Sequence, residues 1–441
     1  MLNIDRTKRI AMMALPIVGA MVSQNVLNLI DTAMVGVLGP AALAGVGVGS
    51  FANFMAIATI IGLASGVQAM ASRRKGEGKV NEMAVPLNGG LFLALIIGLP
   101  LSIVLYFSAP ALFPIINSDP AVVANGTPYL QARLIGALAV GFNFSYRGYW
   151  NGVGLSALYM KTLLVIHGLN ILFNYLLIFG NFGFPEMGAE GAGLASTIAL
   201  YIGSIIHTVM AYRLARGHGF LTRIPRSETM TTMLKLALPG SIQQFLFAAG
   251  FTVFFWIIGQ VGVNEVAVSN VMINIIMVAI LPGMGLGLAA LSMVSEALGR
   301  GDPVDAKMWG WDAAKLGGIV LGFMGLIALF LPETILGGFI HEASVVQLGI
   351  LPMRILGASM VFEGVGLVLL NTLLGAGAAS RVMIISIVTQ WMVGLPLAWL
   401  VGPYLGMGLV WIWVANISYR ILQDIIFVIV WQRGRWAKIK I

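Results

Sequence analysis

The sequence predicts an all-α membrane protein with twelve transmembrane helices in two six-helix lobes, related by pseudo-twofold symmetry along the membrane normal. Three observations support this class. Of the 441 residues, 59% are hydrophobic and only 10% are charged, the mean hydropathy is +0.94, and the first half of the chain is repeated in the second. A soluble domain carries about 25% charged residues, so we expect a multi-pass membrane protein.

Apolar runs long enough to cross a bilayer follow one another along the whole chain. A helical span needs about 20 apolar residues, and Gly, Pro and charged residues divide the sequence into twelve such runs. The expected spans, in order, are residues 10–36, 44–71, 86–110, 129–149, 159–180, 190–214, 232–260, 266–296, 309–331, 349–373, 382–402 and 405–431.

Basic residues gather at four places that an even number of spans puts on one side of the membrane. These are Arg6, Lys8 and Arg9; Arg73, Arg74, Lys75 and Lys79; Arg213, Arg216, Arg223 and Arg226; and Arg433, Arg435, Lys438 and Lys440. The loops between them on the other side carry acidic residues and no Lys or Arg. The positive-inside rule therefore places both termini in the cytoplasm, and we expect the bacterial inner membrane. The basic residues should meet anionic lipid headgroups rather than nucleic acid.

The two halves of the chain align without a gap over about 65 residues when shifted by 223 positions. Ala14-Leu15-Pro16 then pairs with Ala237-Leu238-Pro239, and Gly36 pairs with Gly259. The repeat predicts an N-lobe at 1–214, a cytoplasmic linker at 215–231 and a C-lobe at 232–441. Six spans per half give the lobes the same orientation, which is typical of transporters that alternate access by rocking two lobes.

Asp31 is the only formal charge between Ile10 and Gly36. A carboxylate at membrane depth costs about 2.5–3.5 kcal/mol on insertion scales, so it normally faces a polar cavity or a partner. Gln24, Asn25 and Asn28 precede it at helical spacing on one face, and we expect them to line a substrate cavity. Interhelical hydrogen bonding is the alternative role for these amides.

Other polar residues lie at a depth from which they can join Asp31. Asn143, Asn170, Asn174 and Ser196 are expected to form a proton or cation site with it, because burial favours the neutral form of a carboxyl group and permits proton exchange near neutral pH. In the second half, Glu363 is a further candidate for ion coupling. Arg420 and Asp424, four residues apart, are expected to form an intrahelical ion pair.

Further polar residues mark the C-lobe as a second wall of the substrate cavity. The candidates are Gln243, Asn270 and Asn274. Pro16 removes a backbone hydrogen bond from the first span and predicts a point of bending, with a passive kink as the alternative. The many Met and Phe residues suit either a tolerant binding surface or ordinary packing.

Several motifs together resemble the multidrug and toxic compound extrusion (MATE) family over nearly the whole chain. They are Ala14-Leu-Pro16, Asp31-Thr-Ala-Met-Val-Gly36, Arg147-Gly148, and Asn170-Ile-Leu-Phe-Asn174-Tyr-Leu-Leu-Ile-Phe-Gly180 with Gly191-Ala-Gly-Leu-Ala-Ser196. The DinF-like branch looks most similar. That resemblance implies a proton-binding Asp31 assisted by Asn143, Asn170 and Ser196, and a departure at Asn174, where many relatives carry an aspartate. The sequence also has Phe247 where the NorM-like branch places a glutamate, which argues against the sodium site of that branch.

The expected function is efflux of small amphipathic or cationic drugs in exchange for protons, by a monomer without cofactors. A sodium-coupled exporter of the same fold and a flippase for lipid-linked precursors are the alternatives. We do not expect an enzyme, since cysteine is absent and the four histidines match no metal-ligand or catalytic motif.

Overall fold

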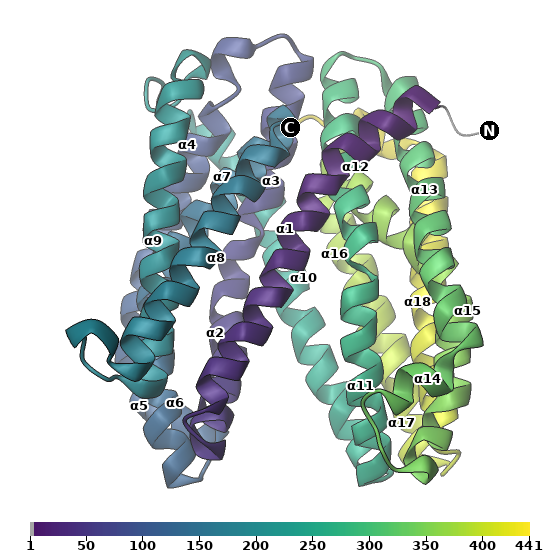
Figure 1. Ribbon diagram of the computed structural model, residues 1–441. Coiled ribbons are helices and arrows are strands. Elements are labelled where there is room, and N and C mark those ends of the chain that lie inside the picture. Colours follow the sequence, from purple (N-terminus) through teal and green to yellow (C-terminus); the bar gives the residue numbers. More distant parts are fainter. Residues whose placement is uncertain (1–3) are drawn as a thin grey trace. The chain divides into compact units, whose positions relative to one another are not determined.

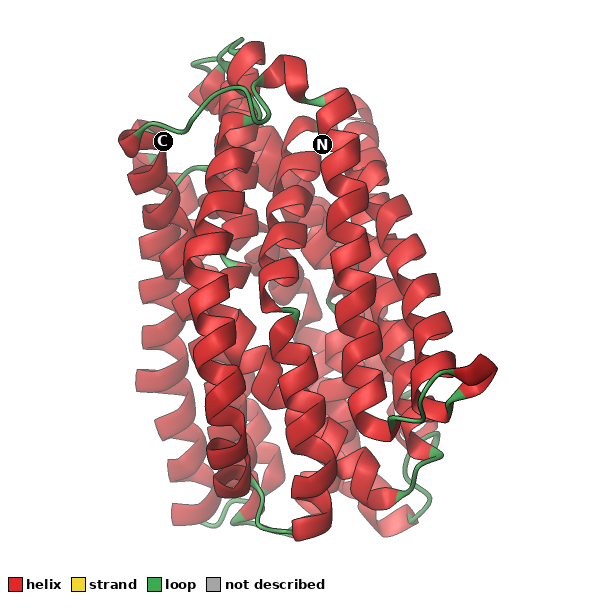
Figure 2. Ribbon diagram, turned by 90° about the vertical axis from the view of Figure 1, so that its left-hand side faces the viewer, coloured by secondary structure: helices red, strands yellow, loops and turns green. Residues whose placement is uncertain are grey.

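The computed structural model describes residues 4–441, and these residues fold into helices joined by short loops, with no strand among them (Figures 1 and 2). Eleven of the helices or helix pairs are long and apolar enough to cross a membrane. The predicted class is therefore confirmed.

The predicted span at 129–149 is the one that is not among these eleven. It is helical, but it is divided at Gly136 between α6 (Pro120–Ile135) and α7 (Ala137–Val153). It also carries Arg133 and Arg147, which lower its apolar character. Residues 129–149 are therefore helical, as predicted, but this segment is more polar than the spans before and after it.

The structure separates into two compact units. One unit comprises Gly19–Ser241, and the other comprises residues up to Val18 together with Ile242–Ile441. The first holds the larger part of α1 (Ile4–Gly36) and the beginning of α10 (Ser227–Gly259). Its other helices are α2 (Pro40–Ile61), α3 (Leu63–Gly76), α4 (Val85–Leu93), α5 (Leu99–Ile116), α6, α7, α8 (Ser156–Phe179) and α9 (Gly188–Leu214).

The second unit contains the remaining helices. They are α11 (Val263–Ala279), α12 (Leu281–Gly299), α13 (Pro303–Phe330), α14 (Pro332–Gly337), α15 (Ala343–Gly375), α16 (Ala379–Ile387), α17 (Leu395–Trp399) and α18 (Leu409–Arg433). Short 3₁₀ or π segments lie between helices at η1 (Val80–Glu82), η2 (Ala94–Gly98), η3 (Asn181–Gly183), η4 (Arg216–His218), η5 (Val388–Gly394) and η6 (Leu400–Tyr404), and η7 (Arg435–Lys438) follows α18.

The unit boundaries differ from the predicted domains 1–214, 215–231 and 232–441. Each boundary falls inside a continuous helix, two residues after Pro16 in α1 and two residues after Pro239 in α10. Residues 4–18 therefore belong with the second half of the sequence, and residues 215–241 belong with the first. The composition of the loops could not reveal these boundaries, because the chain passes from one unit to the other within α1 and within α10.

Small residues bring neighbouring helices together within each unit. In the first unit α8 packs on α9, and in the second α13 packs on α15. Gly317 of α13 and Gly364 of α15 meet backbone to backbone, with no room for a Cβ at either position. Close approach through small residues is how membrane helices gain packing energy without a hydrophobic driving force.

Candidate functional site

Asp31 is half-buried on α1, and its carboxylate is held by α8. Asn174 donates its side-chain amide to Asp31 Oδ1 at 2.6 Å. The same Nδ2 group donates to Asn170 Oδ1 at 3.0 Å, and Asn170 Nδ2 donates to Ser196 Oγ of α9 at 2.8 Å. The structure thus joins Asp31, Asn174, Asn170 and Ser196 into one hydrogen-bonded chain that crosses three helices.

Asn174 donates hydrogen bonds in both directions along this chain. On one side the acceptor is Asp31, and on the other the donations continue through Asn170 and Ser196 to the backbone carbonyl of Ala192. The carbonyl oxygen of Asn174 is buried and accepts no hydrogen bond. The arrangement therefore suits an ionised Asp31 and leaves one acceptor beside it unused.

Asn143 does not take part in this chain. Its side-chain amide donates to the carbonyls of Ala139 and Leu200 and to Ser204 Oγ, at 2.8–2.9 Å. Asn143 therefore ties α7 to α9 at a different level from Ser196. Its expected depth in the membrane and the family resemblance had grouped it with Asp31.

A second polar group on α1 lies one to two turns before Asp31. Gln24 donates to Asn28 Oδ1 at 3.1 Å, and Gln24 Oε1 lies 3.2 Å from Nε2 of His167 on α8. Gln24 and Asn28 are exposed, whereas Asn25 is partly buried and donates to the Met21 carbonyl. Sequence reasoning missed His167, although His167, Asn170 and Asn174 share one face of α8 at helical spacing.

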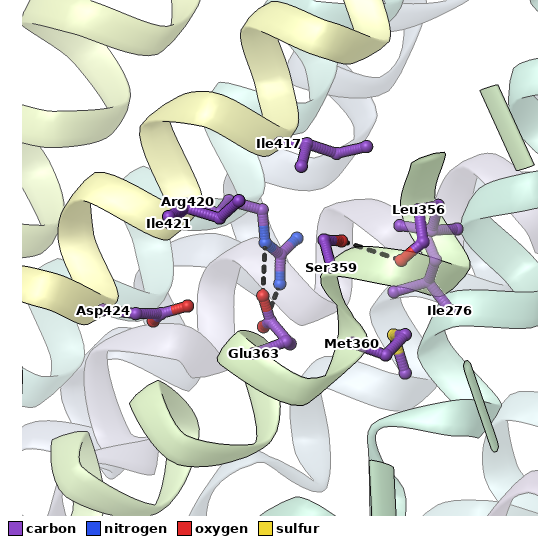
Figure 3. A pocket seen from close by; sticks show the side chains of 9 residues that line it. All are labelled: Ile276, Leu356, Ser359, Met360, Glu363, Ile417, Arg420, Ile421 and Asp424. Atoms are coloured by element: carbon purple, nitrogen blue, oxygen red, sulfur yellow. Dashed lines mark hydrogen bonds and ion pairs between the residues drawn. The ribbon is translucent and has the colours of Figure 1, made fainter. Parts of the chain in front are cut away.

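Glu363 and Arg420 form a partly buried ion pair between α15 and α18 (Figure 3). Arg420 donates through Nε to Glu363 Oε2 at 2.9 Å and through a terminal nitrogen to Oε1. The predicted pair of Arg420 with Asp424 is therefore wrong. The intrahelical spacing was suitable, but the guanidinium fork matches two carboxylate oxygens across the helix interface better.

The other polar residues predicted for the C-lobe are separate from one another. Gln243 is partly buried and donates to Ser386 Oγ at 3.1 Å. Asn274 donates to Asn270 Oδ1 at 2.7 Å, and both are exposed on α11. The pair on α11 leaves polar groups accessible, as a cavity wall requires, whereas Gln243 links α10 to α16.

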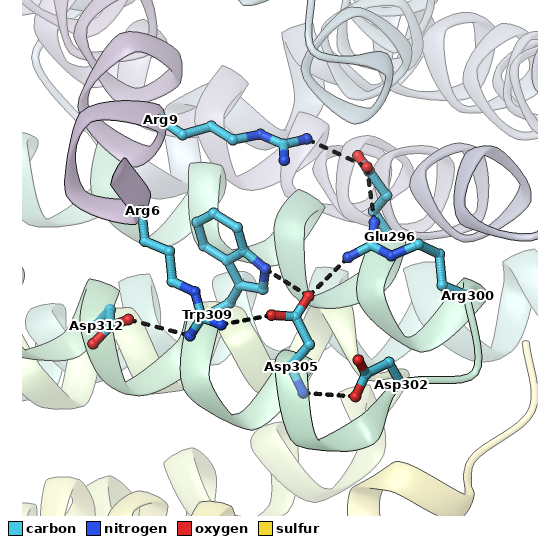
Figure 4. Close-up of polar contacts among 8 residues, drawn as sticks. All are labelled: Arg6, Arg9, Glu296, Arg300, Asp302, Asp305, Trp309 and Asp312. Carbon is cyan, nitrogen blue, oxygen red and sulfur yellow. Dashed lines mark hydrogen bonds and ion pairs between the residues drawn. The ribbon is translucent and has the colours of Figure 1, made fainter. Parts of the chain in front are cut away.

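Charged residues at the start of α1 are bound to α12 and α13 in the second unit (Figure 4). Arg6 donates to Asp305 at 2.8 Å and to Asp312 at 3.4 Å, and its guanidinium lies 5.2 Å from the centre of the Trp309 ring. Arg300 also pairs with Asp305 at 2.8 Å. These basic residues had been assigned only to orientation and lipid contact, and their pairing with acids far along the chain was not predicted.

No group of three His, Cys, Asp or Glu side chains able to hold a metal ion occurs in residues 4–441. The titratable groups that the helices bring together are instead carboxylates with amide or guanidinium partners. Such sites can bind and release protons or organic cations.

The MatE family profile matches residues 16–176 and again residues 239–400. The two matches begin at Pro16 and Pro239, the positions that the internal repeat pairs.

Two bacterial relatives match almost from end to end. A probable multidrug resistance protein NorM of Thermotoga maritima is 24% identical over 438 residues, covering 98% of this chain and 93% of the relative. The multidrug resistance protein NorM of Photobacterium profundum is 26% identical over 422 residues, covering 93% and 92%.

Two solved structures share the fold. An outward-facing multidrug resistance MATE family transporter of the MOP superfamily superimposes with a TM-score of 0.89 at 21% identity, covering 99% of this chain and 97% of that one. A MOP superfamily transporter from Pyrococcus furiosus, whose binding pocket is described as having reversed polarity, gives 0.87 at 23% identity, with the same coverage.

Proposed function

Because this chain belongs to the MatE family, we propose that it is a membrane antiporter that exports small amphipathic and cationic compounds in exchange for protons. The relatives named as multidrug resistance proteins support export of drugs. Proton coupling is supported by one observation, the half-buried carboxylate of Asp31 at the end of a hydrogen-bonded chain within a membrane-spanning helix.

The chain from Asp31 to Ser196 can stabilise both protonation states of the aspartate. When Asp31 is ionised, it accepts from Asn174, as the structure has it. When Asp31 is protonated, its hydroxyl needs an acceptor, and the unused carbonyl oxygen of Asn174 becomes that acceptor once the amide rotates. Asn170 and Ser196 then reverse in turn, so Asp31 keeps a hydrogen-bond partner in both states, while the NH2 group of Asn174 takes the buried position in which its carbonyl oxygen has no partner.

Substrate release follows from the charge on Asp31. An ionised carboxylate attracts a cation, and a proton that arrives from outside removes this attraction. One charge that moves through about 100 mV contributes about 2.3 kcal/mol, and each pH unit adds about 1.4 kcal/mol. Together the two terms can concentrate an uncharged substrate by several hundredfold, whereas for a monovalent cation the electrical term cancels and each pH unit supports about tenfold.

The exposed amides provide uncharged contacts for varied substrates. Gln24 and Asn28 form one hydrogen-bonded pair and Asn270 and Asn274 form another, with each pair on a single helix. Amides donate and accept in many geometries, which suits a site with several ligands. Pro16 interrupts the backbone bonds of α1 near the unit boundary, and we assign it the bending that alternating access requires.

The test uses everted membrane vesicles that carry the wild-type protein, Asp31→Asn or Asp119→Asn. Asp119 is a suitable control because it caps α6 through its side chain, and Asn is an equally good cap. Dye-induced proton movement should occur with wild type and Asp119→Asn and should be absent with Asp31→Asn at equal expression. Unaltered exchange in Asp31→Asn would reject the role of Asp31. Efflux driven by sodium at zero pH difference would instead favour a sodium-coupled exporter.

A further inference from the structure

Three charged groups gather inside the second unit, and only two of them are paired. Glu363 on α15 binds Arg420 on α18, and Asp424 lies one turn beyond Arg420. The side chains of Glu363 and Arg420 are 16% and 18% exposed, and Asp424 is 6% exposed. One guanidinium thus stands beside two carboxyl groups in a setting from which water is largely excluded.

Glu363 and Arg420 form a bidentate ion pair, which is the geometry in which a guanidinium group best matches a carboxylate. Two nitrogens of Arg420 donate to the two oxygens of the same carboxylate. A bidentate pair of this kind is stronger and more specific than a single contact. The positive charge of Arg420 is balanced by the carboxylate of Glu363, so no further positive charge is left to stabilise an ionised Asp424.

The carboxyl group of Asp424 fills the space left by the missing side chain of Gly366. The Asp424 side chain packs against Gly366 of α15, where a Cβ would collide with the carboxyl atoms. Asp424 Oδ2 is buried and has no hydrogen-bond partner. Figure 3 shows this carboxyl group directed toward the Glu363–Arg420 pair.

A small cavity lies beside the three groups. Its volume is about 10 Å³, which is room for about one water molecule. Asp424, Glu363, Arg420 and Ser359 contribute to its wall, and the rest of the wall is mainly apolar. A buried, unpartnered and ionised carboxylate in such a place is strongly disfavoured, whereas uptake of one proton makes it neutral.

We propose that Asp424 is a second proton-binding site, which is protonated while Arg420 is bound to Glu363. The ionisable groups that interact with Asp424 are Glu363 from α15 and Arg420 and Tyr419 from α18. Arg420 and Asp424 are four residues apart on one helix, so the guanidinium can reach either carboxylate. Whenever Arg420 moves to Asp424, the proton leaves Asp424 and Glu363 loses its partner. Proton binding to Asp424 therefore depends on whether Arg420 is bound to Glu363 on α15 or to Asp424 on α18.

This site is independent of the role proposed for Asp31, and the experiment keeps the two apart. Purified full-length protein that carries Asp31→Asn is studied by infrared difference spectroscopy over a pH titration, with no substrate and no gradient. The readout is the stretching band of a protonated carboxyl group, identified by its shift in deuterium oxide. Asp31 cannot contribute to this band, and failure of proton-coupled transport would leave the measurement unchanged.

Two further variants are made in the Asp31→Asn background. Asp424→Asn should remove one protonated carboxyl band with little change in melting temperature, because an amide resembles a neutral acid in shape and charge. Glu363→Gln should remove the same band, since Arg420 is then free to bind Asp424 and hold it ionised. If Asp424→Asn fails to fold, Glu363→Gln still tests the proposal in an intact Asp424 site.

A band that persists unchanged in both variants would overturn the proposal. A band that is lost in Asp424→Asn but kept in Glu363→Gln would overturn the link to Arg420. Sodium chloride in place of choline chloride should leave the band unchanged. Loss of the band in sodium would show that sodium displaces the proton from Asp424, and would overturn the assignment of the site to protons alone.

Discussion

Asn174 donates its side-chain amide to the carboxylate of Asp31 over 2.6 Å, so the partner of the membrane aspartate is a group that cannot titrate. The same amide also donates to Asn170, which fixes the plane in which it meets Asp31. One amide thus connects the charged residue of α1 to a hydrogen-bonded chain on α8 and α9.

Asn174→Leu should impair exchange far more than it impairs folding. The substitution removes a hydrogen bond to a charged group, which is worth about 1.5–3 kcal/mol, or roughly 10-fold to 150-fold. The initial rate of dye-dependent proton movement in vesicles measures the effect, with expression checked by immunoblotting. Asn174→Asp, which retains an acceptor beside Asp31, serves as the comparison and should keep exchange. Equal rates for Asn174→Leu and wild type would remove Asn174 from the mechanism.

Asn143→Ala and Ser196→Ala should separate a structural residue from a site residue. Asn143 donates to Leu200 and Ser204 and so joins α7 to α9, and we expect a lower melting temperature with an unchanged pH profile of transport. Ser196 ends the chain from Asp31, and its loss should change the pH profile with a smaller loss of stability. The reverse pattern would show that Asn143, rather than Ser196, belongs to the proton site.

Gly366→Ala should destabilise the protein by about 1–3 kcal/mol, because the new methyl group meets the carboxyl atoms of Asp424 and forces the core to shift. Gly47→Ala on α2 is the matched control. A Cβ at Gly47 has no neighbour within 4 Å, so this change should be neutral or slightly stabilising through helix propensity. Thermal unfolding in detergent measures both. Equal melting temperatures for Gly366→Ala and Gly47→Ala would show that the space at Gly366 is not needed by the side chain of Asp424.

Asp305→Asn should loosen the first turns of α1 from α13. Asp305 accepts from Arg6, Arg300 and Trp309, so one substitution weakens three contacts. We expect faster proteolysis near the N-terminus and a loss of stability that shrinks at high salt. Glu77→Gln is the control, because Glu77 forms its ion pair with the exposed Lys79 and exposed pairs contribute about 0–1 kcal/mol. Identical proteolysis of both variants would contradict the prediction that Asp305 holds the first turns of α1 in place.

The membrane site was accessible to sequence reasoning because its members follow helical spacing around a costly charge. Asp31, Asn170, Asn174 and Ser196 were predicted together, and the structure joins them. Asn143 was grouped with them from its expected depth and the family resemblance, neither of which specifies the direction of a side chain around its helix. His167 shares a face with Asn170 and Asn174, and this spacing was the available signal.

Composition and local pattern were enough to predict the membrane class, the position of the apolar helices, the duplicated plan and Asp31 as the one charge of its span. These properties follow from local composition, because a bilayer selects each segment by its length and hydrophobicity. Helix packing was needed to establish that Arg420 binds Glu363 rather than Asp424, that Arg6 binds Asp305, and that the boundaries of the compact units fall within α1 and α10. Each of these depends on which distant helices pack together, and a single charged residue is compatible with several partners until that packing brings one of them within reach.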